Sequence, residues 1–299
     1  MDKIVLIRPL FPRFLQPNPP LGLGYLAAVL EKNGYKVYII DCGLLNINYE
    51  KVIDYLIKIK PILIGITSLT VHYNQMKKLS NLIKENSELK DIPLVLGGVH
   101  VTFLPETSIK ECNADFCIIG EGEITLLELV NAIKNKTPLN EIKGLAFKQN
   151  DDIIINEPRD LIENLDELPF PAWHLIPPNL YPQDPHGHEY IRAPYAPIMT
   201  TRGCPFKCSY CASTNFWKNK FRRRSPKNVV DEIEFLMKNF GIREIHIWDD
   251  NFTLIKNHVI GICNEIIKRG LDLKLKCPNG VRVDSLDEKL LAKMKKAGF

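Results

Sequence analysis

The 299-residue sequence has no run of about 18 uninterrupted apolar residues, the length that a membrane-spanning helix needs. Its N-terminus carries only a short apolar stretch, residues 4–7, with no cleavage-like site after it. The net charge of +4 is too small to indicate a nucleic-acid partner. The eight cysteines are even in number, but without a secretion signal a disulfide framework is not expected. These absences predict a cytoplasmic globular protein with no membrane span and no nucleic-acid partner.

Several polar or reactive residues have ordinary structural explanations. Four cysteines lie inside apolar or helical patterns and are expected to be small core residues: Cys42, Cys112, Cys117 and Cys263. A local basic run is expected to be a solvated face: Lys218, Lys220, Arg222, Arg223 and Arg224.

Residues 1–140 alternate short β-rich runs, such as KIVLIR and KVYIID, with helical periods. Five such strands separated by helices predict an α/β fold with a doubly wound, parallel five-stranded sheet. Ligands of such sheets bind beyond the carboxyl ends of the strands. Glycines and hydroxyls are expected at those turns: Gly22, Gly24, Thr67, Gly97 and Gly98.

The alternation of strands and helices stops after this region. Residues 141–195 combine an expected hairpin, turning at Asn150 and Asp151, with a density of prolines that forbids regular elements, and predict an ordered linker. A second α/β rhythm of three strand–helix units fills residues 196–299. Ser225 is expected to cap the first helix of this region and Ser285 the last one.

Three cysteines crowd one loop that follows the first strand of this second region. Cys204, Cys208 and Cys211 are spaced C-x3-C-x2-C. A structural zinc site is closed by four protein ligands, and Cys277 or a histidine could supply the fourth. An iron–sulfur cubane also has four irons to ligate, so three thiolates leave one position open, either for a distant residue or for chemistry.

The flanks of the loop, in the stretch CPFKCSYC, favour the iron–sulfur interpretation. A C-x3-C-x2-C loop with an aromatic residue before the last cysteine resembles the radical S-adenosylmethionine (SAM) enzymes. In that superfamily three thiolates hold a [4Fe-4S] cluster, and SAM chelates the fourth iron through its amino and carboxylate groups. An electron from the reduced cluster cleaves SAM to a 5′-deoxyadenosyl radical. The resemblance implies that Cys204, Cys208 and Cys211 ligate the cluster and that residues 196–299 form the first half of a (β/α)6 partial barrel.

The same resemblance implies contacts with SAM. The aromatic residue before the last cysteine matches one whose backbone contacts adenine. An aspartate of the stretch WDDNF would receive the SAM ammonium group, although both aspartates could instead cap the next helix. The stretch NGVRVD offers an amide and a guanidinium to the SAM carboxylate or ribose. The residues so assigned are Phe206, Tyr210, Asp249, Asp250, Asn279 and Arg282.

A doubly wound domain ahead of such a barrel resembles the cobalamin-binding subgroup, which includes anaerobic magnesium-protoporphyrin IX monomethyl ester cyclase and the hopanoid and phosphonate methylases. Stretches such as GGVHVTFLPE and LDELPFPAW carry this likeness along the whole chain. Cobalamin domains carry D-x-H-x-x-G, then S-x-L, then G-G. The resemblance implies cobalamin contacts at Gly22, Gly24, Thr67, Ser68, Leu69, Gly97 and Gly98.

The first cobalamin motif is missing, because the loop PLFPRFLQPNPPLGLG contains no histidine. His72 and His100 lie at other strand ends and could coordinate cobalt or be hydrogen-bonded structural residues. Either cobalamin binds without a histidine ligand, or the domain has kept the fold and lost the cofactor. We favour binding.

These resemblances imply an oxygen-sensitive radical SAM enzyme that uses cobalamin for methyl transfer or a related oxidative or cyclising reaction on a small molecule. An external electron donor of the flavodoxin or ferredoxin type is implied as a partner. The alternative is a cobalamin- or cluster-carrying module without turnover. Because such barrels have six strand–helix units and only three are counted, we expect an N-terminal fragment with an open half-barrel and an exposed strand edge near Leu273–Cys277.

Overall fold

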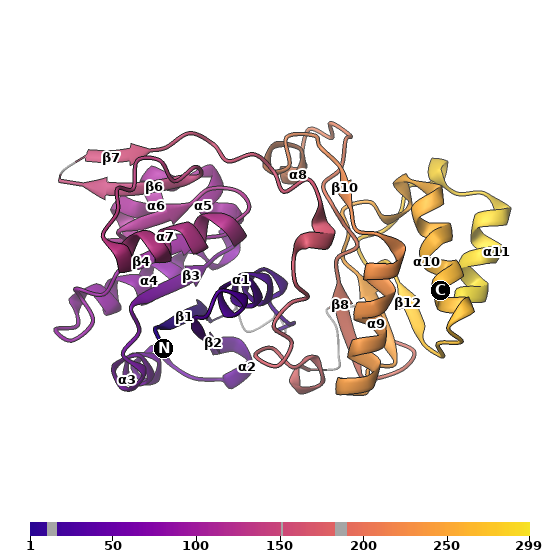
Figure 1. Cartoon of the computed structure of the whole chain (residues 1–299), viewed down its shortest axis with the longest axis horizontal. Helices are drawn as coiled ribbons and strands as arrows, with labels where there is room; N and C mark the ends of the chain where they lie inside the picture. Colours follow the sequence, from indigo (N-terminus) through magenta and orange to yellow (C-terminus); the bar gives the residue numbers. More distant parts are fainter. Residues whose placement is uncertain (11–16, 151, 183–189) are drawn as a thin grey trace. The chain divides into compact units, whose positions relative to one another are not determined.

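The computed structural model describes residues 1–10, 17–150, 152–182 and 190–299. These form two compact units, the first comprising Met1–Leu161 with Pro171–Ile176 and the second comprising Ile162–Phe170 with Pro177–Phe299. Asp151, expected at the hairpin turn, lies outside the described residues, as do residues 11–16 of the histidine-free loop. Each unit is built around its own sheet, which is mostly parallel in the first unit and parallel in the second (Figure 1).

The first unit contains a seven-stranded sheet in the order β2-β1-β3-β4-β5-β6-β7. Its strands are β1 (Lys3–Arg8), β2 (Lys36–Asp41), β3 (Leu63–Thr67), β4 (Leu94–Gly97), β5 (Phe116–Ile118), β6 (Leu145–Gln149) and β7 (Asp152–Ile155). The first five strands are parallel, which confirms the expected doubly wound sheet. The hairpin β6–β7 pairs antiparallel with β5 and so extends this sheet, because its residues Leu145, Ala146 and Phe147 are buried there.

Helices cover both faces of this sheet. They are α1 (Leu21–Lys32), α2 (Cys42–Leu45), α3 (Tyr49–Ile59), η1 (Thr70–His72), α4 (Tyr73–Glu85), α5 (Val99–Phe103), α6 (Pro105–Cys112) and α7 (Glu123–Asn135). Alternate residues of β1 enter two separate cores: Ile4 and Leu6 pack with α1 and α7, whereas Val5 and Ile7 pack with α3, α4 and α6. A strand that is buried on both faces has a nearly continuous apolar sequence. This explains why the residues between Lys3 and Arg8 in β1 are all apolar.

The second unit contains a parallel sheet in the order β12-β11-β8 and a separate antiparallel pair, β9 and β10. Its strands are β8 (Tyr195–Ile198), β9 (Thr201–Arg202), β10 (Arg222–Arg223), β11 (Glu244–Ile247) and β12 (Lys274–Lys276). Its helices are η2 (Leu165–Glu167), η3 (Pro178–Leu180), α8 (Ala212–Phe216), α9 (Pro226–Phe240), η4 (Phe252–Leu254), α10 (Lys256–Lys268), η5 (Val283–Ser285) and α11 (Glu288–Ala297). The three expected strand–helix units are therefore present.

Two helix starts in the second unit test the capping expectations. The Ser225 hydroxyl accepts a hydrogen bond from the Asn228 amide, and Pro226 is the first residue of α9, as expected. The expectation for Ser285 is wrong, because Asp287 caps α11 by accepting from the Leu290 amide. Ser285 instead ends η5 and shares a hydrogen bond with Thr253.

In the basic run that was expected to be a solvated face, Lys218, Lys220 and Arg223 are exposed, but the expectation is wrong for Arg222 and Arg224. Arg222 and Arg224 are only 5% and 4% exposed. Arg222 donates to the Ile162 carbonyl, and Arg224 pairs with the buried carboxylate of Glu232. Buried charges need such partners. Ile162 is 60 residues from Arg222 in the sequence, and Glu232 is 8 residues from Arg224.

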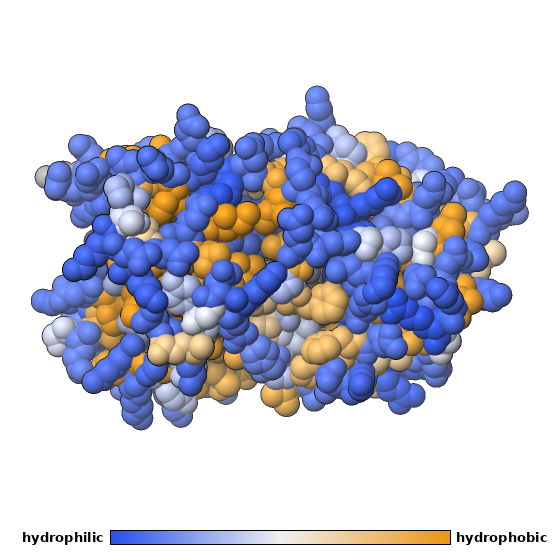
Figure 2. Space-filling view, viewed as in Figure 1, coloured by the Kyte–Doolittle hydropathy of each residue, from blue (hydrophilic) through white to orange (hydrophobic). Residues whose placement is uncertain are grey.

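Among the described residues, no helix is long and apolar enough to cross a membrane. Hydrophilic residues dominate the face shown in Figure 2, with apolar residues in small groups between them. Three of the four cysteines expected in the core, Cys42, Cys112 and Cys117, are buried in the first unit, and Cys263 is buried in the second.

Candidate functional site

The three-cysteine loop of the second unit is closed at its base by the antiparallel pair β9–β10, in which Arg202 lies opposite Arg222. Gly203 opens the loop with a φ of +91°, and a Cβ there would lie 2.1 Å from the Lys220 carbonyl oxygen. Only glycine permits this backbone approach. Cys208 is exposed, whereas Cys204 and Cys211 are partly exposed. All three thiols therefore remain accessible on one loop whose two ends are held together.

Asp249, expected as a SAM contact, instead supports the start of this loop. Its carboxylate accepts hydrogen bonds from the Thr200 amide at 2.6 Å, the Thr200 hydroxyl at 2.5 Å and the Thr201 amide at 3.1 Å. The residue is 2% exposed. Burial raises the pKa of Asp249 to about 6, and the hydrogen bonds act in the opposite direction. With its oxygens occupied in this way, Asp249 supports the loop, and the predicted contact with the SAM ammonium group stays a prediction for Asp250.

His258 extends this network. Its Nε2 lies 3.1 Å from the Thr200 hydroxyl oxygen. Burial, with help from Arg223 and Arg224, lowers the pKa of His258 to about 4, so the ring is neutral at pH 7. Because Thr200 donates its proton to Asp249, the neutral ring donates from Nε2. The sequence reasoning missed this network, although the paired hydroxyls of TTRGC before the loop were a signal for it.

Asp250 is exposed and lies at the same strand end, where one of its oxygens accepts from the Gly203 amide at 3.2 Å. The side-chain amide of Asn279 donates to the Asp249 carbonyl at 3.3 Å. The structure thus brings three of the predicted SAM contacts to the base of the cysteine loop. Neither aspartate caps η4, since Asn251 precedes that helix, so the capping alternative is wrong.

Arg282 and Phe206 form a contact that sequence reasoning did not foresee. The guanidinium carbon lies 3.9 Å from the centre of the Phe206 ring. The Nε and Nη2 atoms of Arg282 donate to the two oxygens of Asp284, at 3.0 and 2.6 Å. Tyr210, in contrast, is 91% exposed. The segment after β12 is therefore tied to the cysteine loop through Arg282.

The donor set of the loop fits an iron–sulfur cubane. Within the described part of the chain, no three His, Cys, Asp or Glu side chains gather as the ligands of one metal ion would. A cubane is ligated at separate iron atoms, so its thiolates do not need to converge on one point. Cys277 does not join the three loop cysteines in any such group of ligands, so the zinc alternative gains no support from it.

The carboxyl edge of the first unit holds most of the predicted cobalamin contacts. Ser68, after β3, donates its backbone amide to the Gly97 carbonyl at 3.0 Å. Gly98 has a φ of +101°, and a Cβ there would lie 2.5 Å from the Ser68 carbonyl oxygen. A Cβ on Gly97 would meet nothing within 4 Å. The turns that follow β3 and β4 therefore pack backbone against backbone and leave open space beside Gly97.

Exposed apolar side chains also follow the carboxyl ends of these strands. Large hydrophobic residues of the first unit that stay at least 39% exposed beyond the ends of β2 to β5 are Leu45, Leu69, Val71, Phe103, Leu104 and Ile124. Exposed apolar residues at the ligand-binding edge of such a sheet are candidates for contact with a ligand. Together with the open space at Gly97, they fit a large, partly apolar ring such as a corrin.

Gly24, in the first turn of α1, was predicted to contact cobalamin, but its surroundings are those of a packing residue. A Cβ on Gly24 would lie 2.7 Å from Ile176 Cδ1 and 2.9 Å from Pro171 Cβ. The Gly24 carbonyl also accepts from the Ala172 amide. Its lack of a side chain serves packing between α1 and residues 171–176, whereas Gly22, with nothing within 4 Å, keeps its prediction.

Both histidines near this edge are buried. His100 Nδ1 lies 3.2 Å from the Thr70 hydroxyl, and its ring packs on Tyr73 at 4.1 Å between centroids. Burial lowers the pKa of His72 and of His100. The Thr70 and Tyr73 contacts of His100 are structural, whereas the Nε2 atom of each histidine is buried and is not part of the Thr70 hydrogen bond, so both of the predicted roles stay open.

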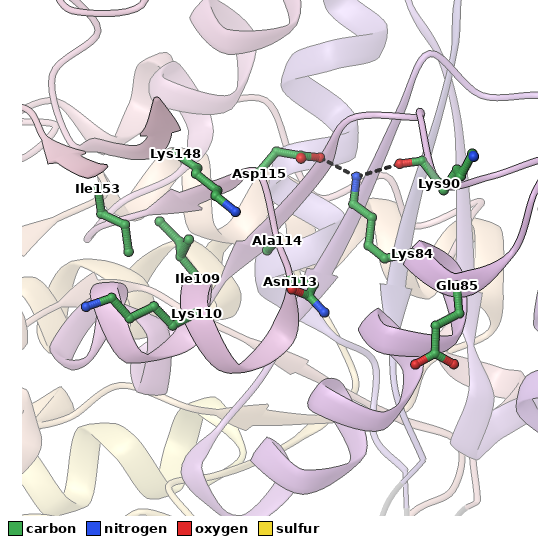
Figure 3. Close-up of a pocket in the computed structure, with 10 residues that line it drawn as sticks. All are labelled: Lys84, Glu85, Lys90, Ile109, Lys110, Asn113, Ala114, Asp115, Lys148 and Ile153. Carbon is green, nitrogen blue, oxygen red and sulfur yellow. Dashed lines mark hydrogen bonds and ion pairs between the residues drawn. The ribbon is translucent and has the colours of Figure 1, made fainter. Parts of the chain in front are cut away.

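A pocket of about 490 Å³ lies at the opposite, amino edge of this sheet (Figure 3). Its central cation, Lys84, donates to Asp115 at 2.6 Å and to the Lys90 carbonyl at 3.0 Å. Asp115 also accepts from the Leu94 amide. These bonds fasten α4 to the starts of β4 and β5, so we assign the pocket a structural role.

Two family models match the chain: a B12 binding domain over residues 8–130 and the radical SAM superfamily over residues 198–299. The chain therefore carries a B12-binding domain followed by a radical SAM domain. This pairing implies a [4Fe-4S] cluster, SAM and cobalamin as cofactors. The three-cysteine loop lies within the radical SAM match, and the turns after β3 and β4 lie within the B12-binding match.

Relatives of the chain are methyltransferases and a cyclase. An uncharacterized methyltransferase of Pyrococcus horikoshii is 35% identical, over 94% of this chain and 59% of the relative. The anaerobic magnesium-protoporphyrin IX monomethyl ester cyclase of Rubrivivax gelatinosus is 32% identical, over 94% of this chain and 50% of the relative. The chain thus spans 59% and 50% of the length of these two relatives.

A solved structure shows the same fold. The radical SAM methyltransferase TsrM from Kitasatospora setae, with tryptophan and a SAM analogue bound, matches with a TM-score of 0.77. The match covers 100% of this chain and 58% of TsrM at 21% identity. The α/β sheet followed by the radical SAM domain is therefore the fold of both proteins.

Proposed function

We propose that this protein is a cobalamin-dependent radical SAM enzyme that methylates a small molecule or carries out a related oxidative or cyclising reaction. The observation that carries the proposal is the accessible three-cysteine loop, closed at its base, in a chain that also has a B12-binding domain. When bound, the cluster and SAM supply a carbon radical, and cobalamin supplies a methyl carrier. Nothing in the comparisons favours the alternative of a module without turnover.

In this proposal, different residues of the second unit bind the cluster, support its loop and contact SAM. Cys204, Cys208 and Cys211 hold the cluster. Asp249 fixes the backbone of Thr200 and Thr201, from which the loop departs. The exposed carboxylate of Asp250 receives the SAM ammonium group, because an anion at this strand end attracts a cation.

Further SAM contacts come from three loops of the second unit. The backbone at Tyr210 meets the adenine, and Phe206 contributes to the same surface. Asn279, already bonded to the Asp249 carbonyl, and the remaining Nη1 of Arg282 lie on the loop that would face the SAM carboxylate or ribose.

Cobalamin rests on the carboxyl edge of the first unit. Gly97 and Gly98 let the backbone approach the nucleotide tail, and Thr67, Ser68 and Leu69 line the neighbouring turn. Because the D-x-H-x-x-G motif is missing and both His72 and His100 are buried, we expect cobalt without a histidine ligand. Gly22 lies at the exposed start of α1, beside the same edge.

The substrate is a small molecule, and the electrons come from a donor of the flavodoxin or ferredoxin type. We place the protein in the cytoplasm, where such low-potential donors and reduced thiols are found.

The proposal is tested by anaerobic reconstitution with iron and sulfide, followed by metal analysis. We expect about four irons and four sulfides per chain. Replacement of Cys204, Cys208 or Cys211 by Ala should abolish this incorporation, whereas Cys42→Ala, in the core of the first unit, should not. Reduction with SAM present should release 5′-deoxyadenosine. Stoichiometric zinc with no labile sulfide would overturn the proposal.

Cobalamin binding needs a separate experiment, which is titration of the chain with hydroxocobalamin followed by electron paramagnetic resonance of the cobalt(II) form. We expect binding at micromolar cobalamin and no histidine-nitrogen splitting. Such splitting would assign a ligand role to His72 or His100. Absence of binding would mean that the domain has kept the fold and lost the cofactor.

A further inference from the structure

Arg282 is held near the three-cysteine loop by two different contacts. Its guanidinium lies over the Phe206 ring at 3.9 Å, and Phe206 lies between the first two cysteines in sequence. Its other partner, Asp284, takes two hydrogen bonds in a bidentate arrangement. A long cationic side chain fixed on two sides keeps one position, although it remains 43% exposed.

The position of Arg282 places its charge within electrostatic reach of the loop's sulfur atoms. The Asp284 carboxylate raises the pKa of Arg282 most strongly, and the Cys208 and Cys204 thiol groups act in the same direction. A positive charge fixed beside Phe206, between Cys204 and Cys208 in sequence, stabilises negative charge that is added to a cluster on this loop.

We propose that Arg282, fixed by Phe206 and Asp284, raises the reduction potential of the cluster that the three-cysteine loop holds. Reduction adds one negative charge to the cluster, and net charge near a cluster is one of the factors that set its potential. The Asp284 carboxylate partly cancels the guanidinium charge. Arg282 therefore raises the reduction potential of the cluster, and Asp284 lowers it. This inference rests on the proposed function only in requiring that the cluster is bound.

The test is a mediated redox titration of the reconstituted cluster, followed by electron paramagnetic resonance and carried out without SAM. At a fixed potential, Arg282→Met should lower the ratio of reduced to oxidised cluster about tenfold, a shift of about 59 mV to more negative potential. Asp284→Asn should shift the potential in the opposite direction. Phe206→Leu, which frees the guanidinium, should shift it in the same direction as Arg282→Met but by less. Raising the salt to about 1 M, where the Debye length is near 3 Å, should reduce all three shifts.

Arg192→Met is the matched control. Arg192 also forms an arginine–aspartate pair, with Asp272 at 2.7 Å, but at the amino end of the same sheet, before β8 and β12. It should leave the potential unchanged. A full cluster with an unchanged potential in Arg282→Met would overturn the inference, as would an equal shift in Arg192→Met.

The failures of the two proposals are distinguishable. If Arg282 acts only as a SAM contact, Arg282→Met weakens SAM binding and leaves the SAM-free potential in place, which contradicts the inference alone. If the unmodified chain assembles no cluster, both the inference and the proposed function are wrong.

Discussion

At the residue scale, burial and hydrogen bonding act in opposite directions on the pKa of Asp249. An unfolded aspartate titrates near 3.8, and burial raises the folded pKa to about 6. The native state therefore binds more protons than the unfolded chain between these values, so stability is greatest below the lower pKa and falls as the pH rises through the window. The loss is about 3 kcal/mol. We expect Asp249→Asn to remove this dependence, which is measured as the difference between the two proteins' unfolding free energies from pH 4 to pH 7. A constant difference across that range would contradict the assigned burial.

Gly97 and Gly98 are adjacent residues with different requirements. Gly98→Ala places a Cβ against the Ser68 backbone at a positive φ, so we expect a loss of about 1–3 kcal/mol of stability, measured by urea denaturation. Gly97→Ala meets nothing within 4 Å and should leave the midpoint unchanged while weakening cobalamin binding. Equal stability losses in the two variants would show that the turn is not packed as described.

At the scale of elements, the start of α9 is a direct test of capping. Ser225→Ala removes the acceptor for the Asn228 amide and should cost about 1 kcal/mol, measured by chemical denaturation. Ser225→Thr keeps a hydroxyl acceptor and serves as the control. An alanine variant as stable as the parent would mean that the cap contributes nothing.

Local signals predicted most of the elements, and the exceptions have tertiary causes. The apolar runs of β1 to β5 and the Ser225–Pro226 start were readable because strand burial and capping depend on neighbours in sequence. Ser285 and Asp287 are both good capping residues, and the hydrogen bond between Ser285 and Thr253, from another element, decides between them. The hairpin β6–β7 was expected, but its pairing with β5 depends on a distant strand.

At the scale of the whole molecule, the cysteine spacing predicted the family, while the surroundings of the loop could not be read from sequence. Asp249 lies 48 residues from Thr201, and no local pattern shows that its carboxylate is occupied. The contact of Arg282 with Phe206 likewise joins two separate loops. Gly24 looked like a ligand-site glycine because its packing partners, Pro171 and Ile176, are remote in the chain.

The central claim is that the three-cysteine loop holds a [4Fe-4S] cluster at which SAM binds. The most direct measurement is the electron paramagnetic resonance spectrum of the reduced, reconstituted chain, recorded before and after SAM is added. We expect a signal from a reduced cluster whose g-values change with SAM, and no such signal in Cys211→Ala. A spectrum from the intact cluster that SAM leaves unchanged would contradict the claim.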